Sequence, residues 1–329
     1  CMLRIATVNL ENLDMGSSAC VPLDARLKLL GPQIRRINAD ILCLQEINAQ
    51  RPEGKSDKAE HRRLDALDAL LKAAGLSDFH VCATRNRAAS GFADIHNLAI
   101  VSRDPMIENH QLWHDLVAEP THRFIEGQDR GKDITLNWDR PAQYGRIALD
   151  GGRVLHCFNL HLRAPLACPV PGEKQDGFVW NSVSAWAEGY YLSEIKRAGQ
   201  ALEVRRKVDQ IFEGEPDALI CIAGDFNAEE HHTPVEILRG DVDNTGNGAL
   251  ASRVMVPVEH SLPETRRFTV IHQGHRQMLD HIMVSRAMLG FYKGSEIHNE
   301  DLADELVGYG AVEASPVSYH APVVAEFDL

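Results

Sequence analysis

The chain has 329 residues, of which 44% are hydrophobic and 25% are charged, as is typical of a globular protein with a sizeable core. Its formal net charge of −13 disfavours a protein that holds nucleic acid through a broad basic face, because lysine and arginine dominate such binding. The charge does not exclude a nuclease, since a bound cation supplies positive charge within a cleft.

The sequence also bears on the cellular compartment. A strand-like run begins at Met2 with no secretory leader before it, and none of the cysteines has Cys-x-x-Cys spacing. No apolar stretch approaches the roughly 20 residues that cross a bilayer. We therefore expect a cytoplasmic protein with reduced cysteines and no membrane span, and the sequence indicates no protein partner.

Short apolar runs of strand length alternate with helical patterns along the chain. Helices are expected over residues 24–38, over residues 63–74 with Gly75 as the closing residue, and from about 192 to 212. The runs that predict buried strands are Ile41 to Leu44, Val81 to Ala83, Leu98 to Val101, Val154 to Leu162 and Ala218 to Ala223. Asp150-Gly151-Gly152 predicts a hairpin turn between residues 146–149 and 153–162, because glycine tolerates positive φ.

Nothing in the sequence divides the chain into separate domains. It has no repeat of fixed period, no low-complexity tract and no linker rich in proline, glycine or serine. We expect one domain over residues 1–329. Residues 164–191 begin with prolines and continue with aromatic side chains, which predicts an inserted loop beside the chemistry.

One segment, Ile220 to Asn227, is an apolar strand that ends in a carboxylate and a carboxamide. Residues two apart in a strand face the same side, so Asp225 and Asn227 are expected to act together. Asp225 would orient a water or bind a metal while Asn227 donates to a phosphoryl oxygen, which suits in-line attack on phosphorus. Gly-Asp-x-Asn is also good turn chemistry after any strand.

Five further segments place polar residues in or near strand-like runs. Glu46 ends one run and offers a hard oxygen ligand for Mg²⁺ or Mn²⁺, and Asn9 interrupts the first run. Asn159, His161 and Arg163 are expected on one face of a strand, where the imidazole would protonate a leaving group and the other two would contact phosphate. Asp280 and His320, if they meet, form a carboxylate–imidazole pair.

In order, these segments resemble the endonuclease/exonuclease/phosphatase superfamily, which includes deoxyribonuclease I and exonuclease III-like proteins. The resemblance implies an α+β fold, namely a four-layer α/β sandwich of two packed, mostly antiparallel β-sheets flanked by helices. It implies a divalent metal, Mg²⁺ or Mn²⁺, near Asn9 and Glu46. It further implies water activation by Asp225 and Asn227, a leaving-group or phosphate role for His161, and pairing of Asp280 with His320.

One position departs from the family's pattern. The last motif normally reads Ser-Asp-His-x-Pro, whereas here Tyr319 stands where the aspartate would be. A phenol is neutral near pH 7 and is a poor substitute for an anionic metal ligand. We expect an active enzyme with altered metal handling.

Three functions stay open on the sequence alone. The first is a metal-dependent nuclease, and the second keeps the chemistry but acts on a phospholipid, a phosphorylated sugar or a small nucleotide. The third is a binding module that has lost catalysis, with Tyr319 as its mark. A zinc site of ordinary structural spacing is absent, although His231 and His232, directly after Glu229 and Glu230, leave open an auxiliary transition-metal position.

Overall fold

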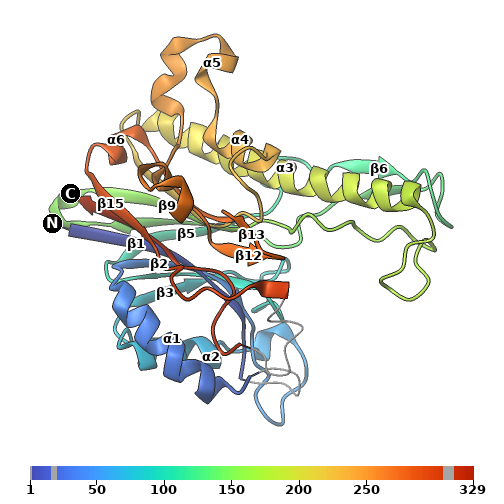
Figure 1. Cartoon of the computed structure of the whole chain (residues 1–329), viewed down its shortest axis with the longest axis horizontal. Coiled ribbons are helices and arrows are strands. Elements are labelled where there is room, and N and C mark those ends of the chain that lie inside the picture. Colours follow the sequence, from blue (N-terminus) through green and yellow to red (C-terminus); the bar gives the residue numbers. More distant parts are fainter. Residues whose placement is uncertain (1, 16–20, 307–314) are drawn as a thin grey trace.

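A computed structural model describes residues 2–15, 21–306 and 315–329 (Figure 1). Two six-stranded sheets form its centre, and most neighbouring strands run antiparallel, with β1–β2 and β9–β10 parallel. The first sheet has the order β15 (Tyr292–Ile297), β16 (Val323–Asp328), β1 (Met2–Leu13), β2 (Ile41–Ile47), β4 (Asn97–Ser102) and β3 (His80–Ala83). The second has the order β11 (Val256–Pro257), β14 (Asp280–Val284), β10 (Leu219–Asp225), β9 (Val154–His161), β8 (Ala142–Ala148) and β5 (Met106–Leu112).

Helices and two small hairpins complete the described chain. The small hairpins pair β6 (Thr121–Arg123) with β7 (Asp133–Thr135) and β12 (Val270–His272) with β13 (His275–Gln277). The α-helices are α1 (Leu23–Ile37), α2 (Asp65–Ala74), α3 (Val183–Gly214), α4 (Thr233–Arg239), α5 (Val242–Thr245) and α6 (Arg286–Leu289). Short 3₁₀ turns span Ala59–His61, Asp150–Gly152, Gly248–Arg253, Val258–Ser261 and Glu264–Arg266.

The four layers follow from the alternation of side chains along the strands. In β2, Ile41 and Cys43 join the core between the two sheets, whereas Leu42 and Leu44 pack in the cluster that contains α1 and α2. The second sheet buries its outer face against α3, with Phe158 among the packed residues. Because both faces are covered at the centre of each sheet, the central strands β2, β4 and β10 are buried along nearly their whole length and mostly apolar. The expected α+β sandwich is confirmed.

Local signals in the sequence account for most element boundaries. The helix expected over residues 63–74 is α2, and Gly75 closes it in the left-handed conformation with a φ of 77°. The hairpin expected around Asp150 joins β8 to β9, with φ of 74° at Gly151 and 76° at Gly152. The five cysteines that the structure describes are free.

The expected loop over residues 164–191 is only partly correct. Helix α3 begins at Val183 and not at about 192, because the Ser182 side chain accepts a hydrogen bond from the Ala185 backbone N–H and caps the helix there. The earlier part of that segment remains irregular. Figure 1 shows the first half of α3 projecting beyond the sheets beside β6. We call residues 120–136 and 164–192 the arm.

A small apolar cluster holds the arm together. Leu192 of α3 packs with Phe124, Leu136, Cys168 and Val170. No helix among the described residues is both long and apolar enough to cross a membrane.

Candidate active site

Polar side chains from both sheets meet at one edge of the sandwich. Asn9 of β1 donates from Nδ2 to Glu46 Oε1 at 3.2 Å and to Asp225 Oδ2 at 3.0 Å, which joins the two sheets. His161, at the end of β9, has its Nε2 atom 3.7 Å from Glu46 Oε1 and 3.6 Å from Asp225 Oδ2. The structure thus brings together residues that four separate motifs contribute.

The backbone around these residues adopts conformations that few residues tolerate. Gly224 has a φ of 148°, and a Cβ atom there would lie 2.0 Å from the Leu160 carbonyl oxygen, so the residue before Asp225 must be glycine. Glu46 and Asn227 have positive φ values of 58° and 48°. Such values cost about 1–3 kcal/mol for residues other than glycine and are concentrated at functional sites.

Asn227 orients the Asp225 carboxylate by hydrogen bonding to both of its oxygens. Its backbone N–H donates to Asp225 Oδ1 at 2.8 Å, and its side-chain Nδ2 donates to Asp225 Oδ2 at 3.2 Å and to the Leu162 carbonyl at 3.0 Å. The carboxylate is therefore fixed in one orientation at the end of β10.

Asp280 and His320 form the pair that the sequence anticipated. His320 Nδ1 lies 2.8 Å from Asp280 Oδ2 and 3.9 Å from Asp225 Oδ2. Thr269 Oγ1 accepts a hydrogen bond from the Asp280 backbone N–H at 3.1 Å and positions that residue. Asp280 Oδ1 is buried and has no hydrogen-bond partner among the described residues. An unsatisfied buried carboxylate oxygen indicates a partner that comes from outside the chain.

The clustered carboxylates shift the pKa values of the site. Burial, reinforced by the charge of Asp280, raises the pKa of Asp225 to about 7. Burial alone would lower the pKa of His320, but the adjacent Asp280 and Asp225 outweigh it and raise that pKa well above the usual value. His320 is thus held as a cation next to acidic groups, and Asp225 exchanges a proton near neutral pH.

His161 is held in the opposite charge state. Burial and the positive charge of Arg140 lower its pKa well below the usual value, so the ring is neutral. Arg140 donates to His161 Nδ1, which leaves the ring proton on Nε2, the atom that faces Glu46 and Asp225. The His96 ring lies nearby, with 5.7 Å between ring centroids and the two planes tilted by 49°.

The sequence motifs did not reveal Arg140 as a contact of His161. The predicted hairpin could have indicated this contact. Because Gln143 pairs with Asn159, the residues just before β8, which include Arg140, lie beside the end of β9, which carries His161.

Two predicted phosphate contacts do not fit this structure. Asn159 is fully buried, accepts from Gln45 Nε2 at 2.8 Å and donates to the Leu44 and Ala99 carbonyls at 3.0 Å each. Its amide joins the two sheets and is not available to a phosphate. Arg163 lies past the end of β9, where its guanidinium pairs with Asp139 and Nε donates to Ser193 Oγ at 3.1 Å.

Asn9 also differs from the metal ligand that the resemblance implied. Its amide nitrogen faces the two carboxylates, while Oδ1 accepts from the Glu11 backbone N–H at 2.8 Å. Asn9 therefore positions Glu46 and Asp225.

The residues present suit a hard divalent cation. Glu46, His161 and Asp225 form one group with ligand atoms within 4.8 Å of one another, and Asp225, Asp280 and His320 form a second. Because the His161 Nε2 atom carries its proton, the carboxylates of Glu46 and Asp225 are the donors of the first group, as Mg²⁺ or Mn²⁺ prefers.

Tyr319 is buried beside this site. Its backbone N–H donates to Glu11 Oε2 at 2.6 Å, and its hydroxyl accepts from the Ser315 backbone N–H at 3.4 Å. The substitution of tyrosine for the expected aspartate leaves His320 paired with Asp280.

The sequence matches the model of the Endonuclease/Exonuclease/phosphatase family over residues 7–320. The chain belongs to this family. Among curated protein sequences, none matches it. Family membership supports hydrolysis of phosphoester bonds and dependence on a divalent metal as the general activity.

Solved structures with the same fold cover nearly the whole chain. An endonuclease/exonuclease/phosphatase family protein from Bacteroides thetaiotaomicron is 18% identical, with a TM-score of 0.59 and coverage of 100% of this chain and 99% of that one. Truncated TDP2 from Caenorhabditis elegans is 16% identical (TM-score 0.57, coverage 100% and 98%). A mannosyl-6-phosphatase from Bacteroides thetaiotaomicron is 17% identical (TM-score 0.58, coverage 99% and 100%). At these identities the likeness establishes the fold alone.

Proposed function

We propose that this family member is a divalent-metal-dependent phosphodiester hydrolase that cleaves by in-line attack of water on phosphorus. The observation that carries the proposal is the meeting of Glu46, His161, Asp225 and the Asp280–His320 pair at one edge of the sandwich. This set contains a base, a neutral hydrogen-bond donor, a cation and oxygen ligands for a metal, which are groups that assist hydrolysis of a phosphodiester.

Each side chain has a defined part in this proposal. Asp225 accepts the proton of the attacking water while Asn227 holds its carboxylate in place. His161 donates a hydrogen bond from Nε2 to the leaving oxygen and keeps its own proton, and Arg140 maintains that tautomer. His320, kept cationic by Asp280, stabilises the negative charge on the phosphoryl oxygens.

A divalent cation completes the site in this proposal. Glu46 is its principal ligand, with Asp225 beside it, and the Asn12 backbone N–H donates to Glu46 Oε2 at 3.0 Å and fixes that carboxylate. When bound, Mg²⁺ or Mn²⁺ neutralises charge on the phosphate and acts as a Lewis acid.

Nucleic acid is the substrate class that we propose first. Phe178, Trp186, Tyr190 and Tyr191 expose aromatic surface on the arm, and aromatic side chains stack on bases without regard to sequence.

A small phosphoester is the second candidate. It is favoured by the net charge of −13, which weakens attraction to a polyanion, and by the mannosyl-6-phosphatase among the structural neighbours. The third reading, a binding module that lost catalysis, is weakened because Tyr319 leaves the Asp280–His320 pair intact.

One experiment separates these candidates. The protein is stripped with EDTA and supplied with Mg²⁺ or Mn²⁺, and hydrolysis is then measured for bis(p-nitrophenyl) phosphate, single- and double-stranded DNA, RNA, and a panel of sugar phosphates and phospholipids. We expect metal-dependent cleavage of the diester and of at least one nucleic acid. Cleavage of the sugar phosphates or lipids alone would transfer the assignment to the second candidate, and inactivity on every substrate with both metals would overturn the hydrolase proposal.

A further inference from the structure

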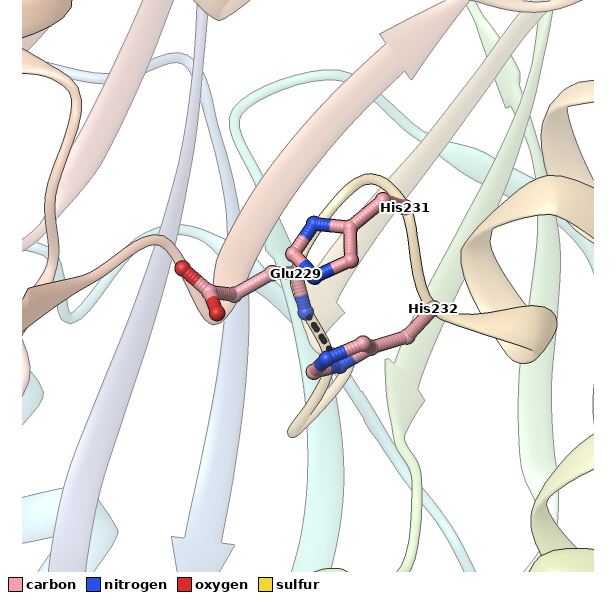
Figure 2. Close-up of side chains that lie close together, drawn as sticks. All are labelled: Glu229, His231 and His232. Carbon is pink, nitrogen blue, oxygen red and sulfur yellow. Dashed lines mark hydrogen bonds between the residues drawn. The ribbon is translucent and has the colours of Figure 1, made fainter.

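A second group of metal-ligand side chains lies outside the catalytic set. The turn between β10 and α4 carries Glu229, His231 and His232, and one ligand atom from each lies within 4.8 Å of the others. Figure 2 shows the two imidazole rings close together, with the Glu229 carboxylate to one side. The ring centroids are 4.5 Å apart, and the planes are inclined by 64°.

The donor types of this group differ from those of the catalytic site. Two imidazoles and one carboxylate make a set that binds Zn²⁺ and neighbouring transition metals, whereas Mg²⁺ prefers oxygen ligands alone. The next carboxylate in the sequence, Glu230, is already committed, because it pairs with Arg239 and lies 2.8 Å from His260 Nε2. Glu229 is therefore the carboxylate available to the two histidines.

The base of the turn is fixed, while the side chains of the group remain accessible. Ala228 is buried, and its carbonyl accepts a hydrogen bond from His281 Nε2 at 2.8 Å. His231 is exposed, and Glu229 and His232 are half-buried. Ligand atoms around a tetrahedral zinc ion lie about 3.3 Å apart for bonds of roughly 2.0 Å, so the exposed His231 ring must rotate slightly to close the set.

His232 must exchange one hydrogen bond for a metal bond. Its Nδ1 atom accepts from the Glu229 backbone N–H at 3.1 Å, so the proton of the neutral ring is on Nε2. A metal bound at Nδ1 takes the place of that N–H group. A metal bound at Nε2 requires the ring proton to be on Nδ1, which then cannot accept, so the hydrogen bond is lost in either case.

From this geometry we propose that Glu229, His231 and His232 form a zinc-binding site on the turn between β10 and α4, distinct from the catalytic cation site. Three protein ligands leave at least one position of a four-coordinate zinc ion for water or for an anionic group of another molecule. The turn comes directly after Asn227, whose backbone N–H donates a hydrogen bond to Asp225 Oδ1. A zinc ion bound at this turn adds positive charge two residues after Asn227 along the chain, in a protein whose net charge is −13.

The test measures zinc binding and does not depend on catalysis. EDTA-stripped full-length protein is titrated with Zn²⁺ in the presence of excess Mg²⁺ by calorimetry, and bound zinc is counted by mass spectrometry of metals. Four proteins are compared: wild type, His231→Ala combined with His232→Ala, the exposed-histidine control His275→Ala, and Glu46→Gln, which removes the catalytic ligand. Circular dichroism and thermal melting confirm that each variant is folded.

We expect the double variant to lose one zinc ion per chain, or at least about tenfold in affinity for it, since even outer-shell changes cost about 10–100-fold at metal sites. His275→Ala and Glu46→Gln should keep this zinc ion. Zinc should also shift the ring ¹⁵N resonances of His232 in wild type. Equal zinc content and affinity in wild type and the folded double variant would overturn the proposal, as would loss of the same zinc ion in Glu46→Gln.

Discussion

The candidate active site, called the cleft below, and the arm are held together in different ways. The cleft gathers Asn9, Glu46, Asp225 and His320 from strands and strand ends far apart in the chain, and two large sheets hold them. The arm is built from two segments, residues 120–136 and 164–192, around a small apolar cluster. Changes in the cleft should therefore alter chemistry without loosening the fold, whereas changes in the arm should loosen that part and leave the chemistry in place.

A few polar and steric contacts add to the apolar cluster of the arm. Glu188 of α3 accepts hydrogen bonds from the Ile125 and Glu126 backbone N–H groups at 2.7 and 2.9 Å, and it lies 2.7 Å from His122 Nε2. Gly189 lets the loop approach the helix, and its carbonyl accepts from the Cys168 backbone N–H at 2.8 Å. These contacts join α3 to the two other segments of the arm.

The largest effect is expected at Asp225. The Asp225→Asn substitution keeps the side chain's shape but removes the base, so kcat should fall by about 10²–10⁴-fold while the melting temperature stays near that of wild type. Steady-state hydrolysis of bis(p-nitrophenyl) phosphate measures the change. Asp133→Asn, on an exposed strand of the arm, is the matched control and should keep full activity. A variant at position 225 with wild-type kcat would refute the assignment of the base.

A smaller loss is expected for the Asp280–His320 pair. Asp280→Asn and His320→Gln should each lower kcat by about 10²-fold, because the carboxylate and the imidazole act as one unit. Groups that act as a unit give non-additive effects, so the double variant should be little worse than either single one. Single and double variants are compared in the same kcat assay. Effects that multiply would show that the two residues act independently.

The arm responds to a change of one methyl group. A Cβ atom at Gly189 would lie 2.3 Å from the Cys168 carbonyl oxygen, so Gly189→Ala should destabilise the protein by about 1–3 kcal/mol. In the same helix, Gly214 has no atom within 4 Å of that position, and Gly214→Ala should change stability by about 0.5 kcal/mol or less. Urea unfolding gives both values. Equal stability of the two variants would show that the loop does not pack on α3 as described.

The smallest expected effect is on the pH dependence of stability, through Glu188 of the arm. Burial favours the protonated form of Glu188, but hydrogen bonds from His122 and two backbone N–H groups outweigh it and lower the pKa of this carboxyl. A carboxyl with a lowered folded-state pKa stabilises the fold above its unfolded value of about 4.3, and that contribution is lost as the pH falls through the folded-state pKa. Glu188→Gln should therefore be less stable than wild type at about pH 7.

The stability gap between Glu188→Gln and wild type should narrow once the pH falls below about 4. Urea unfolding of both proteins over this pH range, with hydrogen exchange of the arm, makes the comparison. A gap that is constant with pH would show that the charge of Glu188 does not contribute.

The sequence predicted the residues of the cleft better than the secondary structure of the arm. Asp225 and Glu46 each end an apolar run, so their place at strand ends followed from local patterns, and the resemblance supplied the pairing of Asp280 with His320. Asn159 was misassigned because strand alternation gives its face but not its depth, and the first sheet covers it through the Leu44 and Ala99 carbonyls. The start of α3 was missed because prolines and aromatic residues obscured the capping signal of Ser182.

The central claim is that the residues around Asp225 direct water onto phosphorus. Hydrolysis of a phosphodiester in H₂¹⁸O with Mg²⁺ or Mn²⁺, followed by mass spectrometry of both products, tests it most directly. The account predicts one ¹⁸O atom in the phosphate product, none in the released alcohol, and loss of this product with EDTA or in Asp225→Asn. Label in the alcohol, or labelled phosphate formed equally well by Asp225→Asn, would contradict it.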